Sequence, residues 1–126
     1  MSYDFANTER ILGLFKSADF NSTADQSIAI RSSKYVVRHI VVSNASASLT
    51  LAAGGIYTGT GKSGTIVVAA AQAYSTLTDS TKYLDLTLAS AVTTDILTSQ
   101  ILYLSLTVPQ GSAATADVYI FGDTLP

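Results

Sequence analysis

The sequence predicts an all-β protein, an antiparallel β-sandwich of about eight strands that is jelly-roll-like. Short runs of residues alternate between apolar and polar side chains with a period of two, which is the spacing of a half-buried strand. Gly, Ser, Asn and Asp, the residues of tight turns, separate these runs, and helical spacing is almost absent. The 126 residues are enough for one domain with a substantial core.

Eight runs are candidate strands, and the first two show the weakest alternation. The order of the strands within the sheets does not follow from one sequence. In chain order the candidates are residues 10–16, 26–31, 35–42, 48–52, 65–70, 83–89, 101–108 and 117–122.

The chain divides into two segments at the polar loop before the second candidate strand. Residues 1–25 are an N-terminal arm or a first strand with its loop, and residues 26–126 are the β-sandwich domain. Phe5, Leu12 and Phe15 lie beside polar residues in the first segment. If this segment is an arm, its deletion should weaken assembly and leave the sandwich folded.

Two candidate strands, residues 35–42 and 65–70, are apolar on both faces. A strand of a two-layer sandwich needs only one apolar face. We therefore expect these two to be central strands covered on both sides, or strands with one side covered by a neighbouring subunit.

Four further strands alternate clearly, which assigns an inward face to each. Pro109 ends one of them directly, as a strand end permits. The residues expected to point into the core are Leu49, Leu51, Leu84, Leu86, Leu88, Leu102, Leu104, Leu106, Val108, Val118 and Ile120.

The stretch "GGIYTGTGKSGT", residues 54–65, resembles the end of a phosphate-binding loop. Such a loop needs a glycine four residues before the Gly-Lys-Ser, but Ile56 stands there. The loop must also open a helix, whereas β-branched residues follow Lys62. We interpret the stretch as a turn between two strands, with Lys62 solvated at its tip and no nucleotide bound.

The composition argues against several functions. The net charge of −2 and pI of about 5.0 do not suit nucleic-acid binding. No apolar run reaches the roughly 20 residues of a membrane span, and the N-terminus does not resemble a signal peptide. Only 13% of residues are charged, against roughly 25% in an average domain, so we expect much of the surface to be held in an assembly.

No group of residues indicates catalysis. The chain has one histidine, His39, and no cysteine, so we expect no metal site. The acidic residues are scattered and select no catalytic pair. We therefore expect a protein that is not an enzyme, with no catalytic residues, no cofactor and no small-molecule substrate.

The tyrosines indicate a contact surface. Tyr83, Tyr103 and Tyr119 lie on the faces opposite the aliphatic ones, and tyrosine is favoured at interfaces. The alternative is that they pair across strands and only stabilise the sheets. The candidate interface residues are Phe5, Leu12, Phe15, Tyr35, Tyr83, Tyr103 and Tyr119.

Two stretches carry a resemblance to a known class: "GGIYTGTGKSGTIVVAAAQAY" and "LYLSLTVPQGSAATADVYIFGD". They resemble β-sandwich virion proteins of tailed bacteriophages, of the capsid decoration (cement) type. The resemblance implies a homotrimer, or binding at symmetry axes of the shell, with the major capsid protein as partner. It also implies a location on the virion after assembly in the cytoplasm of the bacterial host. A tail or baseplate component and a carbohydrate-binding host-adhesion module remain alternatives.

Overall fold

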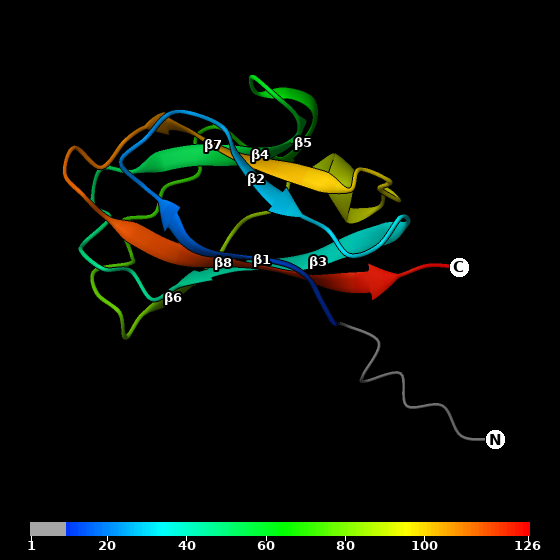
Figure 1. Ribbon diagram of the computed structural model, residues 1–126, viewed down its shortest axis with the longest axis horizontal. Helices are drawn as coiled ribbons and strands as arrows, with labels where there is room; N and C mark the ends of the chain where they lie inside the picture. The colour runs from blue at the N-terminus through cyan, green and yellow to red at the C-terminus, as the bar shows by residue number, and fades with distance from the viewer. Residues whose placement is uncertain (1–9) are drawn as a thin grey trace.

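The computed structural model describes residues 10–126, so Phe5 lies outside the described residues. Two four-stranded antiparallel sheets pack face to face (Figure 1). Among the described residues, no helix is long and apolar enough to cross a membrane. The elements are β1 (Arg10–Asp19), β2 (Gln26–Ala29), β3 (Tyr35–Ser43), β4 (Ala53–Gly59), β5 (Ser63–Val68), β6 (Tyr83–Asp85), the 3-10 helix η2 (Ser90–Thr93), β7 (Ile101–Val108) and β8 (Thr115–Thr124).

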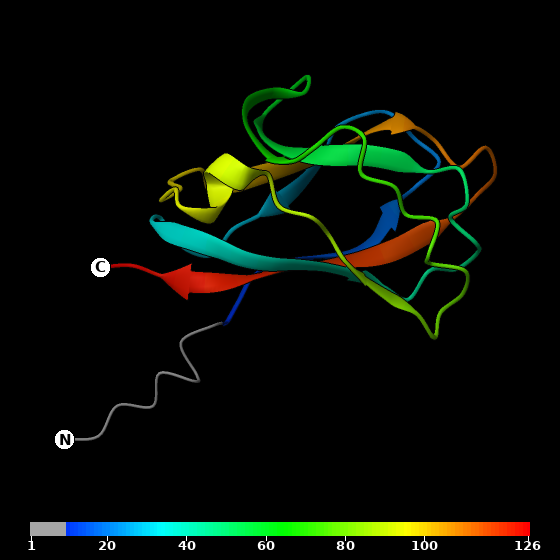
Figure 2. The same ribbon diagram turned by 180° about the vertical axis from the view of Figure 1, so that it is seen from behind.

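The strand order identifies the sandwich as a jelly roll. The first sheet has the order β1-β8-β3-β6 and the second has β2-β7-β4-β5. The pairs β1–β8, β2–β7, β3–β6 and β4–β5 are nested, first with last and innermost with innermost. A long hairpin rolled up so that successive pairs alternate between two sheets has this order. The predicted β-sandwich is confirmed, and Figure 2 shows the same two layers from behind.

The core lies between the sheets and is built largely by the inward faces that the alternation predicts. Leu102, Leu104 and Leu106 of β7 are fully buried, as are Val118 and Ile120 of β8. Each strand places alternate side chains on opposite faces, so the residues between these belong to the outer face of their sheet.

Val108 was predicted to point inward but is exposed, because β7 contains a bulge. Gly54 of β4 pairs with Leu106, and Ala53 pairs with Val108. Thr107 is therefore an extra residue in β7, and an extra residue reverses the alternation beyond it.

The inward prediction holds only in part for the other leucines. Leu86 is buried, but Leu84 and Leu88 are only partly buried, and β6 is three residues long. Leu51 is 63% exposed. It lies in a bend before β4, where its N–H donates to the side chain of Gln110 at 2.9 Å, so strand alternation does not apply to it.

A bulge also explains why residues 35–42 are apolar on both faces. The register shifts between Val37 and His39, so Arg38 is an extra residue in β3. Val37 and Ile40, on either side of the bulge, are both buried. The inward positions change from odd to even numbers here, so the bulge accounts for apolar residues on both faces. The strand is a central one, as predicted, and cover by a neighbouring subunit stays a prediction.

The second stretch with two apolar faces, residues 65–70, has the same explanation. Ile56 of β4 pairs with Val68, but the next residue of β4, Tyr57, pairs with Ile66. Val67 is therefore the extra residue, and Val67 and Val68 are both buried while Ile66 is exposed. This strand is an edge strand of the second sheet, not a central one.

Several glycines lie where neighbouring backbones approach closely, and the approach is tightest at Gly122 and Gly55. A Cβ at Gly122 in β8 would lie 2.0 Å from the carbonyl oxygen of Val36. A Cβ at Gly55 in β4 would lie 2.1 Å from that of Val68. Real Cβ atoms do not approach backbone atoms this closely, so any other residue at these positions would push the adjacent segments of the chain apart.

Residues 10–19 form a strand of the first sheet rather than an arm. Leu12, Ala18 and Phe20 are part of the core. Deletion through Phe20 would remove these core contacts and the partner of one edge of β8. The expectation that the sandwich stays folded without this segment is therefore wrong for residues 10–20.

Replacing Leu104 by alanine should lower the free energy of unfolding by about 2–5 kcal/mol, because Leu104 is fully buried and the change leaves a cavity. Leu51→Ala is the matched control and should cost less than about 0.5 kcal/mol, as surface substitutions do. Urea unfolding followed by circular dichroism measures both. Equal losses in the two variants would contradict the assignment of the core.

Candidate interaction surface

The glycine-rich stretch forms the β4–β5 hairpin. The predicted turn is confirmed only for residues 60–62, because residues 54–59 belong to β4, a strand that the sequence analysis did not predict. Gly61 and Lys62 have φ angles of 65° and 60°, and two successive positive φ values are the mark of a type I′ turn. The Lys62 side chain does not simply extend into water, because its ammonium donates to the hydroxyl of Ser105 at 2.9 Å. The hairpin tip therefore folds back over the outer face of β7.

A carboxylate completes this contact, which we call the hairpin clasp (Asp25, Gly61, Lys62 and Ser105). Asp25, in the loop before β2, accepts the Gly61 N–H at 2.8 Å. That hydrogen bond, and then one with the Ser105 hydroxyl, lowers the pKa of Asp25 below its ordinary value of 3.8. Ser105 is fully buried, so the serine–lysine contact lies beneath the hairpin tip and joins it to β7.

The clasp should titrate at an acidic pH. A depressed pKa means that Asp25 stabilises the folded state above pH 3.8 and that this contribution is lost as the pH falls through the lower folded value. The Gly61 amide proton, followed by NMR, should report this transition with a midpoint below 3.8, and Asp25→Asn should abolish it. A midpoint at or above 3.8 would contradict the clasp.

The outer face of the first sheet carries an apolar stripe, which consists of Ile11, Leu14, Tyr119 and Phe121. The rings of Tyr119 and Phe121 stack with centroids 6.2 Å apart and an interplanar angle of 15°. On the neighbouring strand Leu14 pairs with Tyr119 and Ile11 with Phe121. Leu14 is 40% exposed, and both aromatic side chains are partly exposed.

Ion pairs lie at the two ends of the apolar stripe. Lys16 Nζ lies 3.8 Å from a carboxylate oxygen of Asp117 at one end. Arg38 Nε lies 2.9 Å from Asp123 at the other. Between β3 and β6, His39 Nδ1 lies 3.2 Å from Asp85 Oδ2. Each acid thus has a partner within the molecule.

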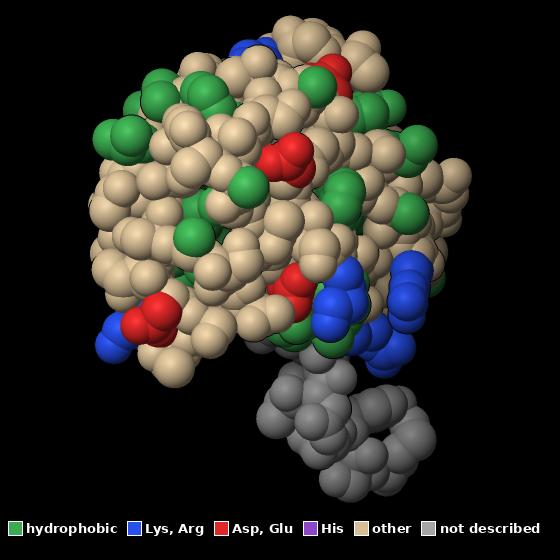
Figure 3. Space-filling model, turned by 60° about the vertical axis from the view of Figure 1, so that its left-hand side comes forward, with side chains coloured by type: hydrophobic (Ala, Val, Ile, Leu, Met, Phe, Trp, Pro, Cys, Tyr) green, Lys and Arg blue, Asp and Glu red, His purple; other side chains and the backbone are tan. Residues whose placement is uncertain are grey.

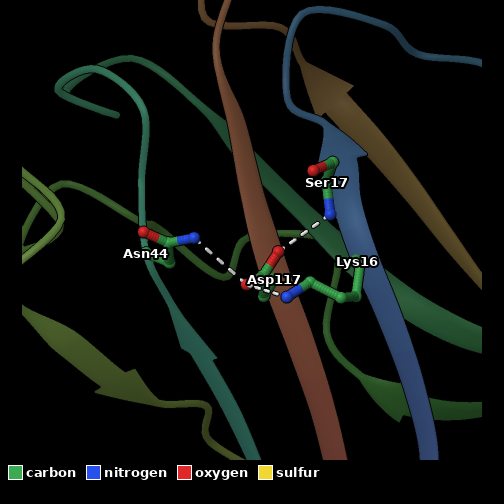
Figure 4. Close-up of polar contacts among 4 residues, drawn as sticks. All are labelled: Lys16, Ser17, Asn44 and Asp117. Carbon is green, nitrogen blue, oxygen red and sulfur yellow. Dashed lines mark hydrogen bonds and ion pairs between the residues drawn. The ribbon is translucent and has the colours of Figure 1, made fainter.

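Asp117 is the most deeply buried acid of this face, 3% exposed, and it holds three strands together (Figure 4). Its carboxylate accepts the Ser17 N–H from β1 at 2.8 Å and the Asn44 side-chain amide after β3 at 3.2 Å. Ser17 and Asn44 have φ angles of 56° and 57°, a left-handed conformation that is unfavourable for most residues. The carboxylate therefore stabilises a strained backbone position at Ser17 and binds Asn44, a residue type that adopts this conformation more readily.

The predicted interface residues do not form one surface. Leu12 and Tyr35 are buried in the core, so both predictions are wrong for a surface role. Leu12 points inward because the β1 register shifts between Ile11 and Gly13. Tyr35 points inward, and its hydroxyl donates to the carbonyl of Ser99.

The other four predicted residues lie in different places. Phe15 packs against the core and is partly buried. Tyr83, 72% exposed, and Tyr119 belong to the first sheet, whereas Tyr103 lies on β7 of the second. The structure therefore brings Tyr119 and Tyr83 to one face and separates Tyr103 from them.

Three members of the apolar stripe, Ile11, Leu14 and Phe121, are not among the interface residues that the sequence analysis listed. The outward position of Phe121 could have been predicted, because Phe121 follows the inward-facing Ile120 in a regularly alternating strand. The two β1 residues were hidden by the bulge, which places Leu12 and Gly13 on the inward side together.

Within residues 10–126, no three His, Cys, Asp or Glu side chains are grouped so that they could hold a metal ion. The face drawn in Figure 3 is mostly backbone and uncharged side chains, with scattered hydrophobic ones. No family model, curated protein or solved structure matches the chain.

Replacing Asp117 by alanine should lower the free energy of unfolding by about 1–3 kcal/mol, because it removes the partner of the Ser17 N–H. The matched control is Asp85→Ala on the same face, whose half-exposed pair with His39 should contribute less than about 0.5 kcal/mol. Thermal and urea unfolding measure both. A loss for Asp85→Ala as large as that for Asp117→Ala would contradict the anchoring role.

Proposed function

We propose that this chain is a non-enzymatic virion structural protein, a decoration protein that binds and stabilises the head shell of a tailed bacteriophage. The observation that carries the proposal is an exposed apolar stripe on a jelly roll with very few charges, 13% of residues. Jelly rolls are common in viral capsid domains. Because a fold alone does not define a function, the argument depends on this surface.

The composition suits a protein whose surface is held in contact with other proteins. Serine, threonine and tyrosine hydrogen-bond across an interface without the desolvation cost of charges. A charge-poor surface repels neighbouring copies weakly, which permits dense packing on a shell. The proposed partners are the major capsid protein and further copies of this chain, and the proposed location is the virion, after assembly in the cytoplasm of the bacterial host.

One observation favours a second candidate, a carbohydrate-binding host-adhesion module. Tyr83 presents 72% of its surface to solvent, and an exposed aromatic ring offers an apolar face to a sugar. Lectin domains also use the jelly roll. A tail or baseplate component differs from the decoration protein only in the partner.

Co-sedimentation tests the proposal directly. Purified protein should bind head shells of the phage that carries its gene, saturate at a fixed ratio to the capsid protein, and raise the temperature at which the shells come apart. Tail tubes and baseplates from the same phage are the control, together with a glycan array probed by the wild type and Tyr83→Ser. Binding to tails or glycans alone, or to none of these, would overturn the decoration role.

A further inference from the structure

The apolar stripe has the exposure and continuity of a contact surface. Pairing places Leu14 beside Tyr119 and Ile11 beside Phe121, so the four side chains are contiguous on two adjacent strands. Val41 of β3 pairs with Tyr119 on the other side and is half-buried, which extends the stripe to a third strand. Contiguous apolar patches on a small protein commonly mark sites of association.

The charges at the ends of the stripe favour an identical partner. Lys16 pairs with Asp117 and Arg38 with Asp123 within one molecule, and exposed Arg10, opposite Gly122, adds a positive charge at the Arg38 end. Like charges brought together at an interface cost several kcal/mol. Two copies related by a two-fold axis through the middle of the stripe avoid that cost, because the Arg10 end of each then meets the Lys16–Asp117 end of the other.

The size of the face also fits a stable contact. The strands β1, β8, β3 and β6 have 10, 10, 9 and 3 residues. At about 4.8 Å between strands and about 3.3 Å per residue they give roughly 500 Å² of flat area. The accessible area is larger because side chains stand out from the sheet. A typical specific interface covers about 800 Å² on each partner.

We infer that the outer face of the β1-β8-β3-β6 sheet binds the same face of a second copy and forms a two-fold dimer. A surface that meets its own copy gives a closed, two-fold contact, in contrast to the homotrimer that the phage resemblance implies. This goes beyond the proposed function, because the dimer forms whether or not the protein is carried on a shell.

The first test compares two outward positions on edge strands. Leu14, 40% exposed, lies on β1 of the first sheet, and Ile66, 49% exposed, lies on β5 of the second. Light scattering over a micromolar concentration series should give twice the chain mass of 13.2 kDa for the wild type and Ile66→Asp. Leu14→Asp should raise the dissociation constant at least about tenfold, because a carboxylate would be buried without a partner.

A second measurement does not depend on how an aspartate affects folding. The chain has no cysteine, so Leu14→Cys and Ile66→Cys each introduce one thiol. Alkylation of the Leu14→Cys thiol should slow as the protein concentration rises, whereas alkylation of the Ile66→Cys thiol should keep the same rate.

Three results would overturn the inference: a wild-type monomer at every concentration, a trimer, or a dimer lost in Ile66→Asp and kept in Leu14→Asp. Shell binding is scored separately. If the wild type is a monomer that saturates head shells, the dimer is refuted and the decoration role is supported. If it is a dimer that does not bind head shells, the dimer is supported and the decoration role is refuted.

Discussion

The arrangement of the first sheet depends on the carboxylate of Asp117. A buried acid is costly unless hydrogen bonds satisfy it, and Asp117 obtains them from Ser17 and Asn44, on either side of its own strand. In return it stabilises both residues in a left-handed conformation. At Ser17 this permits the bulge that changes the register of β1 between Phe15 and Ala18. The edge strand therefore keeps Ala18 in the core while Leu14, paired with Tyr119, faces outward in the apolar stripe.

Bulges mark the limit of what this sequence could predict. Where a strand alternates without interruption, as around Leu104 and Ile120, the inward face can be predicted from the sequence alone. One extra residue in a bulge reverses the alternation. The position of the bulge depends on the partner strand, which cannot be identified from the sequence. Arg38, Val67 and Thr107 are such residues. The strand order could not be predicted for a related reason. The paired strands β1 and β8 lie at opposite ends of the sequence, and periodicity carries no information about which distant strands pair.

The candidate surface was predicted only in part for the same reason. Tyr119 lies on the outer face because β8 alternates regularly, but Leu12 and Tyr35 are core residues. The hairpin was correctly separated from a phosphate loop by its spacing and its β-branched residues. The contact between Lys62 and Ser105 could not be foreseen, because it joins residues on strands that only the fold makes neighbours.

The close backbone approaches at Gly55 and Gly122 limit which sequences can share this architecture. Most outward positions accept many residues, so chains with this fold can diverge until overall similarity disappears. These two positions cannot drift in the same way, since even an alanine methyl would meet a carbonyl oxygen of the adjacent chain segment. A remote relative should therefore retain a glycine at the position of Gly55 in the fourth strand and one at that of Gly122 near the end of the last. This pair offers a fixed register for alignment where the rest of the sequence offers none.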